Sequence, residues 1–169
     1  MLVNGILYNS EAWHSISQQE IQSLEKIDES LLRFLLNSHS KAPMEALYLE
    51  IGAIPIKFII SSRILNFLQT IMKRGEEELT KRVLLAQINN PTEGDFGELV
   101  KKDFQSIGVV FDLSYVESTG VEAFRNHVKN KIRKAAFEYF KNVQKNHNKV
   151  KDIKYERMET QPYLKSTLF

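Results

Sequence analysis

Residues 55–75 read PIKFIISSRILNFLQTIMKRG, and this stretch decides the fold. Pro55 suits the first turn of a helix, because its fixed φ matches the helical value. Lys73 and Arg74 followed by Gly75 are typical of the carboxyl end of a helix, where cations complement the helix dipole and glycine adopts a left-handed conformation. Between these signals, apolar residues cover most of the circumference, so this helix is predicted to be the most buried element. Its apolar residues are Ile56, Ile59, Ile60, Ile64, Leu65, Phe67, Leu68, Ile71 and Met72.

Helical signals continue on both sides of this stretch. Residues 17–20 (Ser-Gln-Gln-Glu) read as a capping box, which opens a helix that runs to about Asn37. Apolar residues recur there at steps of three and four and predict one buried face: Ile21, Leu24, Ile27, Leu31, Phe34 and Leu35. Pro43 and Gly52 are placed to begin and end a short helix between them. Further helices are predicted over residues 76–88, 96–107 and 121–146.

Strand signals are few. Val109–Phe111 is the only strand-like run, and three residues cannot support a sheet. The expected fold class is therefore all-α, a multi-helix bundle of roughly six to seven helices in one or two packed lobes. We expect a helical lobe over residues 1–90, a helical linker lobe over 91–154 that contains the long basic helix, and a tail over 155–169 that leads to a missing downstream region.

Composition bounds the class of protein. The chain has 169 residues, of which 43% are hydrophobic and 26% charged, as in an ordinary globular protein. It contains no cysteine, which excludes disulfides, thiolate nucleophiles and cysteine-based metal sites. No apolar run approaches the length of a membrane span, and residues 1–9 are too short and uncharged for a signal peptide. We therefore expect an intracellular protein of the cytoplasm, the nucleus or both.

Positive charge is concentrated in one segment. Residues 1–120 hold 11 Lys and Arg against 16 Asp and Glu, whereas residues 121–154 hold 10 against 3. A compact basic segment on an acidic body is typical of contact with a polyanion. The alternative interpretation is a solvated helix that is rich in lysine.

The long helix over 121–146 carries the candidate site. Its predicted core stripe is Val121, Phe124, Val128, Ile132, Ala135, Tyr139 and Val143. A second stripe at the same spacing is basic, with Glu138 interrupting it, and we predict that it contacts phosphates. The predicted nucleic-acid-binding residues are Lys131, Lys134, Lys141, Lys145 and Lys149, with Arg125, Lys129 and Arg133 beside them.

Sequence patterns of catalysis are missing. None of the seven glycines forms a phosphate-binding loop, and no serine lies in a nucleophile-elbow motif. The four histidines are not spaced as metal ligands, and no two aspartates are adjacent, as two-metal phosphoryl transfer would favour. We therefore expect no catalytic residue, no metal site and no cofactor in this chain.

Several stretches, taken in order, resemble one family. They are residues 7–13 (LYNSEAW), residues 43–56 (PMEALYLEIGAIPI) and residues 63–68 (RILNFL), followed by residues 94–100 and 161–164. This set resembles the region just after the catalytic palm in reverse transcriptases of non-LTR (LINE-type) retrotransposons. The family's Tyr-Gly-Ser-Glu-x-Trp pattern has Asn9 at the glycine position here. Asparagine tolerates a left-handed backbone, so the turn is expected to survive the change.

The resemblance implies a thumb lobe, within residues 1–90, followed by a helical linker. In the family this region holds the template–primer duplex, and the palm aspartates would precede Met1. The chain alone would then be no enzyme, although its parent would be an RNA-directed DNA polymerase. The implied partners are nucleic acid, as an RNA–DNA hybrid or duplex contacted through its backbone, and the remainder of the parent polymerase, with no membrane.

A second hypothesis needs no nucleic acid. The chain would then be an α-helical protein–protein interaction module, a retained or exapted fragment, that binds through the apolar helix over residues 56–72. The aromatics Tyr8, Trp13 and Tyr48 bear on both hypotheses. They are able to stack on bases, but the preferred interpretation is that they anchor the core.

Overall fold

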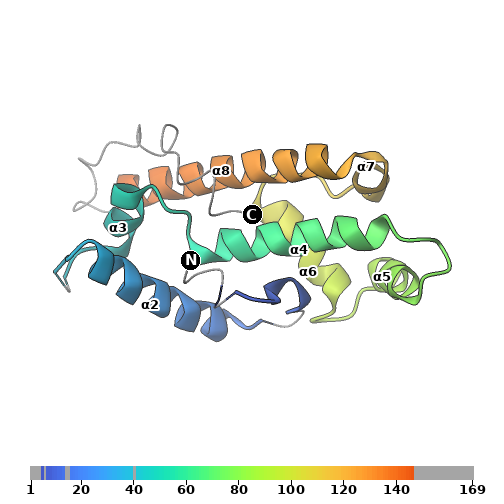
Figure 1. Cartoon of the computed structure of the whole chain (residues 1–169), viewed down its shortest axis with the longest axis horizontal. Helices are drawn as coiled ribbons and strands as arrows, with labels where there is room; N and C mark the ends of the chain where they lie inside the picture. Colours follow the sequence, from blue (N-terminus) through green and yellow to red (C-terminus); the bar gives the residue numbers. More distant parts are fainter. Residues whose placement is uncertain (1–4, 6, 14–15, 40, 147–169) are drawn as a thin grey trace. The chain divides into compact units, whose positions relative to one another are not determined.

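The computed structural model describes residues 5, 7–13, 16–39 and 41–146. One 3-10 helix, η1 (Ser10–Ala12), is followed by α2 (Gln18–Leu35), α3 (Met44–Ile51), α4 (Ile56–Met72), α5 (Leu79–Asn89), α6 (Phe96–Ser106), α7 (Leu113–Ser118) and α8 (Val121–Asn146) (Figure 1). The described residues contain no strand. The all-α prediction is therefore confirmed.

The chain divides into two compact units, and each is assembled from separate segments. The first contains Ser17–Ile59 and the part of α8 from Arg133 onward, and the second contains Asn9–Ile16 and Ile60–Ile132. Each unit takes residues from both sides of residue 90, where the sequence predicted a boundary between lobes. Both α4 and α8 contribute residues to the two units. The predicted tail over 155–169 lies outside the described residues.

The core of the first unit forms where α2, α3 and α8 supply apolar side chains. Buried residues of this cluster are Leu32, Leu47, Tyr48, Leu49 and Phe140. The rings of Tyr48 and Phe140 lie 6.1 Å apart and are tilted against each other, which is a favourable aromatic arrangement. Gly52 ends α3 with φ 70°, the left-handed conformation that glycine adopts without strain, as the sequence predicted.

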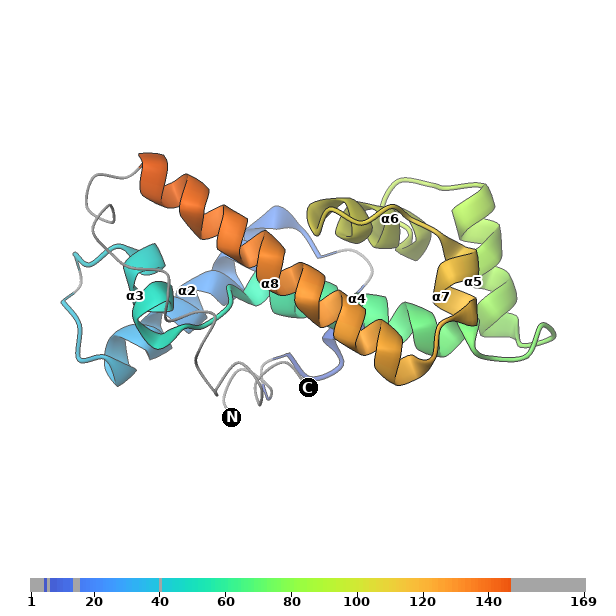
Figure 2. The same cartoon turned by 90° about the horizontal axis from the view of Figure 1, so that it is seen from above.

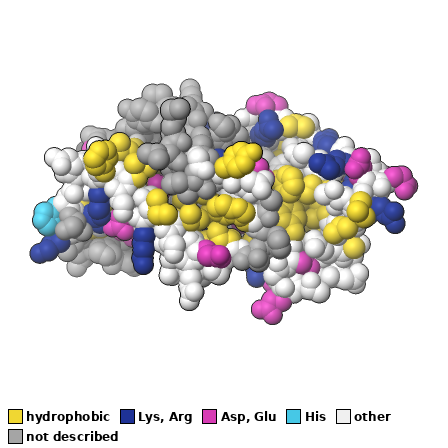
Figure 3. Space-filling model, turned by 60° about the horizontal axis from the view of Figure 1, so that its bottom comes forward, with side chains coloured by type: hydrophobic (Ala, Val, Ile, Leu, Met, Phe, Trp, Pro, Cys, Tyr) yellow, Lys and Arg dark blue, Asp and Glu magenta, His cyan; other side chains and the backbone are white. Residues whose placement is uncertain are grey.

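The predicted buried face of α2 was largely wrong. The capping box is present, since Ser17 Oγ accepts from the Glu20 backbone and the Glu20 carboxylate accepts from the Ser17 backbone. However, Ile27, Phe34 and Leu35 are exposed by 49%, 82% and 61%, whereas Asp28 is only 6% exposed. Figure 3 shows hydrophobic side chains open to solvent on one face of the molecule.

A single hydrogen bond explains the difference. The Tyr48 hydroxyl donates to Asp28 Oδ2 at 2.5 Å, and this partner allows the carboxyl group to be buried. Burial raises the pKa of Asp28, while the hydrogen bond from Tyr48 opposes that shift. Burial and the nearby Asp28 charge raise the pKa of the Tyr48 hydroxyl as well. The helix therefore turns Asp28, rather than its apolar stripe, toward α3.

Helix α4 is buried as predicted. Ile56, Ile64, Leu65 and Leu68 are each at most 1% exposed. The helix also buries polar residues, and in the second unit Gln69 Nε2 donates to the Thr119 carbonyl oxygen at 3.1 Å. Because buried amides need partners, this bond fixes the chain where it leaves α7.

In the second unit, α5 and α6 pack closely as neighbours (Figure 2). Gly97 lies against the α5 backbone, where an added Cβ would come within 2.9 Å of the Gln87 carbonyl carbon. Asp95 caps α6 by accepting from the Glu98 backbone at 2.7 Å. Lys101 Nζ donates to the Ile88 carbonyl oxygen at 2.9 Å, which satisfies an acceptor at the end of α5.

Lys81 is a buried cation on α5 that contacts both the segment before α5 and helix α7 of the second unit. Its side chain is 3% exposed, and Nζ lies 2.5 Å from Glu76 Oε1 and 2.6 Å from Glu117 Oε1. The hydrogen bonds that Lys81 donates to these two carboxylates, first to Glu117 and then to Glu76, raise its pKa. This pairing ties α5 to α7, a helix that the sequence analysis missed although Asp112 caps it.

Candidate nucleic-acid interface

The register of α8 decides which of the predicted basic residues face solvent. Its fully buried side chains follow steps of four along the whole helix: Phe124, Val128, Ile132, Ala136 and Phe140. The predicted stripe was right from Phe124 to Ile132. Its first residue, Val121, is 45% exposed, and its last three, Ala135, Tyr139 and Val143, are only half-buried. The sequence offers both registers, because Ala135–Ala136 and Tyr139–Phe140 are adjacent apolar pairs.

Steps of four make the buried stripe turn around the helix. Each residue advances about 100°, so a step of four moves the stripe by about 40°, and Phe140 lies about 160° around α8 from Phe124. The buried side of α8 therefore changes from one end of the helix to the other, and so does the side on which a basic residue is exposed.

Their spacing on the helix separates the predicted basic residues into two rows. Arg125, Lys129 and Arg133 follow each other at steps of four, while the second row contains Lys134, Lys141 and Lys145. The centres of the two rows lie roughly 140° apart around the helix axis. Arg125 and Lys129 belong to the second unit, whereas Arg133 and the second row belong to the first.

The second row, hereafter the lysine row, lies wholly in the first unit. All three of its side chains, on Lys134, Lys141 and Lys145, are exposed. They fall within about 40° of one another around the helix and cover about 16 Å along it, at 1.5 Å per residue. This arrangement presents three ammonium groups to solvent in one direction.

One carboxylate interrupts the lysine row, as the sequence indicated. Glu138 Oε1 lies 3.8 Å from Lys141 Nζ, and both side chains are about half exposed or more. An exposed pair at this separation contributes little to stability, because water and salt screen it. Lys141 is therefore only weakly held and is free to turn toward an anion.

Most of the other predicted residues are less accessible. Lys129, Lys131 and Arg133 are half-buried, and only Arg125 in the first row is exposed. The Lys131 charge, together with burial, lowers the pKa of His127, with burial the larger cause. Lys149 lies outside the described residues.

The aromatic residues divide between core and surface. Tyr48 is buried, as the core interpretation predicted, and Trp13 is half-buried. Tyr8 is 82% exposed, so the expectation that it anchors the core is wrong. Asn9, at the predicted turn, has φ 59° and ψ 20°, which confirms the left-handed backbone expected there.

Lys57 is a cation of the first unit that the sequence analysis did not single out. Its Nζ lies 3.9 Å from the centre of the Tyr139 ring and 5.3 Å from that of Phe58. Burial lowers the pKa of Lys57, with the charge of Glu25 opposing the shift. No sequence signal marks it, because it stands inside the most apolar helix; its aromatic contacts give it a role in packing.

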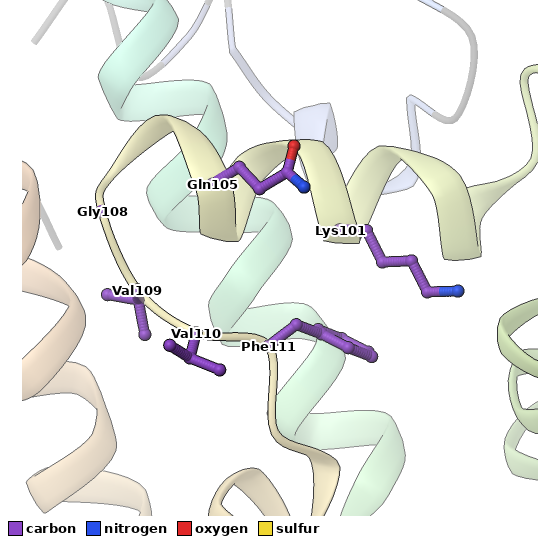
Figure 4. A pocket seen from close by; sticks show the side chains of 6 residues that line it. All are labelled: Lys101, Gln105, Gly108, Val109, Val110 and Phe111. Carbon is purple, nitrogen blue, oxygen red and sulfur yellow. The ribbon is translucent and has the colours of Figure 1, made fainter.

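A pocket of about 480 Å³ lies in the second unit, between α6 and the segment that follows it (Figure 4). Its walls are Lys101 and Gln105 from α6 and residues 108–111 of the connecting segment. Figure 4 shows Lys101 and Phe111 extending toward the same side of the pocket. The Lys101 ammonium group donates a hydrogen bond to the Ile88 carbonyl oxygen.

Two further findings concern metals and membranes. In the ranges that the structure describes, no three His, Asp or Glu side chains gather where they could hold a metal ion. Among the described helices, none is by itself long and apolar enough to cross a lipid bilayer. Only the bent pair of α3 and α4, taken together, reaches the necessary length and composition.

Comparison with known proteins supplies no relative from which a function could be carried over. No protein-family model matches the chain, no curated protein matches it, and no solved structure matches it.

Proposed function

We propose that this chain binds double-stranded nucleic acid through its phosphate backbone, with the lysine row of α8 as the contact surface. The observation that carries the proposal is the exposure of Lys134, Lys141 and Lys145 in one sector of a single helix. Each ammonium group is a point charge with three donors, and its long stem lets it follow a phosphate that is imperfectly placed.

The length of the lysine row suits a duplex. Phosphates on one strand advance about 3.4 Å along the axis for each base pair, so about 16 Å of helix faces roughly five phosphates. Three lysines spread over that length contact the backbone without any need to read bases. Binding of this kind positions a duplex and carries no sequence preference.

The same proposal includes the parent protein. By the resemblance of its motifs, the chain is a thumb and linker segment of a LINE-type reverse transcriptase, itself non-catalytic, whose duplex is the RNA–DNA hybrid that leaves the polymerase site. The left-handed Asn9 supports this assignment, because the family motif places glycine at that turn.

The direct test is fluorescence anisotropy with a short labelled RNA–DNA hybrid at low salt. A variant with Lys134, Lys141 and Lys145 changed to Gln is expected to bind more than about tenfold more weakly than the parent chain, since it loses three phosphate contacts. The matched control changes the exposed residues Lys26, Lys41 and Arg82 to Gln, which alters net charge equally but leaves α8 intact.

The control separates a local contact from a general charge effect. If both triple variants weaken binding equally, net charge alone attracts the hybrid and the lysine row is not the site. If the folded parent chain does not bind at low salt, the proposal fails for this chain. Circular dichroism of each variant establishes that the helices are retained.

The alternative hypothesis, a protein-interaction module, needs a different contact surface from the one that the sequence suggested. The helix over residues 56–72 was its proposed contact, but the apolar side chains of α4 are mostly buried within the described structure. Among the described helices of the first unit, α2 has the most exposed apolar face, and Phe34 on it is 82% exposed. The exposed face of α2 is therefore the more suitable contact surface for a protein partner.

A further inference from the structure

Two hydrogen-bonding side chains border the lysine row on one side. Around the axis of α8, Glu138 lies about 20° beyond Lys145, and Asn142 lies about 40° further in the same direction. Both side chains are exposed, and both residues belong to the first unit, as the lysine row does. We call Glu138 and Asn142 the acceptor edge, because each side chain carries an oxygen that accepts hydrogen bonds.

The Glu138 carboxylate retains its capacity to accept hydrogen bonds. Lys141 Nζ lies 3.8 Å from Glu138 Oε1, which is longer than a hydrogen bond, and the Glu138 side chain is 60% exposed. An exposed pair at this distance adds little to stability. The carboxylate is therefore open to a donor on a bound molecule.

A carboxylate beside a row of phosphate-binding lysines distinguishes between two kinds of backbone. An ionised carboxylate only accepts hydrogen bonds, and it repels phosphates. The backbone of DNA supplies phosphates and no hydrogen-bond donor, whereas each ribose of RNA adds a 2′-hydroxyl group, which is able to donate. The Glu138 carboxylate consequently has a favourable partner on an RNA backbone and none on a DNA backbone.

The position of Glu138 suits a contact with a sugar. Along the helix axis it lies between two lysines, about 6 Å from Lys134 and about 4.5 Å from Lys141. Phosphates of one strand repeat about every 3.4 Å along the duplex axis, so roughly three phosphate steps separate these two lysines. The sugars of that strand lie between the phosphates, and Glu138 faces this interval from the side of the row.

We propose that Glu138 and Asn142 accept hydrogen bonds from 2′-hydroxyl groups, so that the lysine row holds an RNA strand in preference to a DNA strand. The inference rests on the proposed function and adds to it the choice of strand: on an RNA–DNA hybrid, α8 lies along the RNA. Asn142 supplies the second acceptor, and its amide group is also a donor for a neighbouring phosphate. The lysines supply affinity, and the acceptor edge supplies the preference for ribose.

Three duplexes of one sequence test this preference: a DNA duplex, an RNA–DNA hybrid, and a hybrid whose RNA strand carries 2′-fluorine in place of the hydroxyl. The fluorinated strand keeps the sugar pucker of RNA and lacks the donor, so it separates the hydroxyl group from the shape of the duplex. In anisotropy titrations at low salt, the parent chain is expected to bind the RNA–DNA hybrid about fivefold more tightly than either other duplex. Equal affinity for the two hybrids would overturn the proposal.

Variants assign the preference to particular residues. The double variant Glu138→Ala, Asn142→Ala is expected to bind the two hybrids with similar affinity. It is also expected to bind the DNA duplex more tightly than the parent chain does, since a repulsive charge is removed.

The matched control changes Glu122 and Asn126 to Ala. These exposed residues have the same types and spacing on α8 but lie in the second unit. The control is expected to retain the preference for the RNA–DNA hybrid. A control that loses the preference, or a double variant at Glu138 and Asn142 that keeps it, would show that the acceptor edge is not responsible.

The variant with Lys134, Lys141 and Lys145 changed to Gln keeps the two conclusions apart. A folded parent chain that binds none of the three duplexes, or binding that survives in the lysine variant, contradicts the proposed function and this inference with it. Binding that the lysine variant loses, but that shows no preference for the RNA–DNA hybrid, leaves the proposed function standing and overturns this inference alone.

Discussion

Asp103 is an unusual residue, because burial holds its carboxyl group in an unfavourable environment. Ser61 Oγ donates to Asp103 Oδ1 at 2.7 Å, while Oδ2 is buried with no hydrogen-bond partner. Burial raises the pKa of Asp103 from 3.8 to about 6, and the Ser61 hydrogen bond opposes the rise. The folded protein therefore binds a proton there at a pH at which the unfolded chain has released it.

This shift predicts that Asp103 costs stability as pH rises. Its contribution is most favourable below pH 4 and is lost as pH increases through about 6, by roughly 3 kcal/mol. Asp103→Asn keeps the acceptor for Ser61 and cannot ionise. We expect the variant to match the parent chain near pH 4 and to be more stable at pH 7 in urea denaturation. An equal difference at both pH values would contradict the role of ionisation.

The pair formed by Tyr48 and Asp28 is the second critical residue-level feature. Tyr48→Phe leaves a carboxyl group that is 6% exposed without its donor, so we expect a loss of about 2 kcal/mol in the free energy of unfolding. Adding Asp28→Leu, which replaces the carboxyl by an apolar side chain, is expected to recover much of that loss. Additive effects of the two substitutions in a double-mutant cycle would show that the pair is not coupled.

At the scale of elements, Gly97 sets how closely α5 and α6 approach. A Cβ there would lie 2.9 Å from the Gln87 carbonyl carbon and 3.0 Å from the Ile88 nitrogen, both backbone atoms that cannot turn away. Alanine normally stabilises a helix interior by about 1 kcal/mol relative to glycine. We expect Gly97→Ala to reverse that sign and to destabilise the protein by about 1–3 kcal/mol.

A second glycine provides the control for this sign. An added Cβ at Gly75 meets nothing within 4 Å, so Gly75→Ala is expected to change the thermal midpoint little. If Gly97→Ala raises the midpoint, then α5 and α6 separate without cost and the close approach does not hold the second unit together.

The elements themselves show what sequence patterns reveal and what they miss. The capping box at Ser17 and the buried α4 were predictable, because each depends on residues close together in the chain. The buried face of α2 was not, because it depends on Asp28 meeting Tyr48, twenty residues away. A hydropathy pattern predicts that Asp28 lies at the surface, because it contains no information about the hydrogen bond from Tyr48.

The candidate site was predictable in composition but not in geometry. The concentration of lysine and arginine on one helix is visible in the sequence, and three of the residues it suggested form one exposed row. The angular separation of the two rows follows from their spacing on a helix and is available from the sequence. Which basic residues are exposed depends on the register of α8, which packing chooses within adjacent apolar pairs such as Tyr139 and Phe140.

At the scale of the whole molecule, the proposed function makes a prediction about salt. A net charge of +2 on 169 residues is too small to hold a polyanion by itself, so binding must depend on local phosphate contacts. Three such contacts release about three counterions from duplex DNA, which gives a slope of about −2.7 in log affinity against log salt. Affinity should therefore fall about 40-fold between about 50 and 200 mM salt.

The slope counts contacts, which makes it more informative than affinity at one salt concentration. The variant with Lys134, Lys141 and Lys145 changed to Gln should have a slope near zero, and each single Lys→Gln change should reduce the magnitude of the slope by about 0.9. Anisotropy titrations at several salt concentrations measure all of these values. A slope that stays near −2.7 in the triple variant would place the phosphate contacts elsewhere on the chain, whereas a shallow slope in the parent chain would show that few phosphates are bound at all.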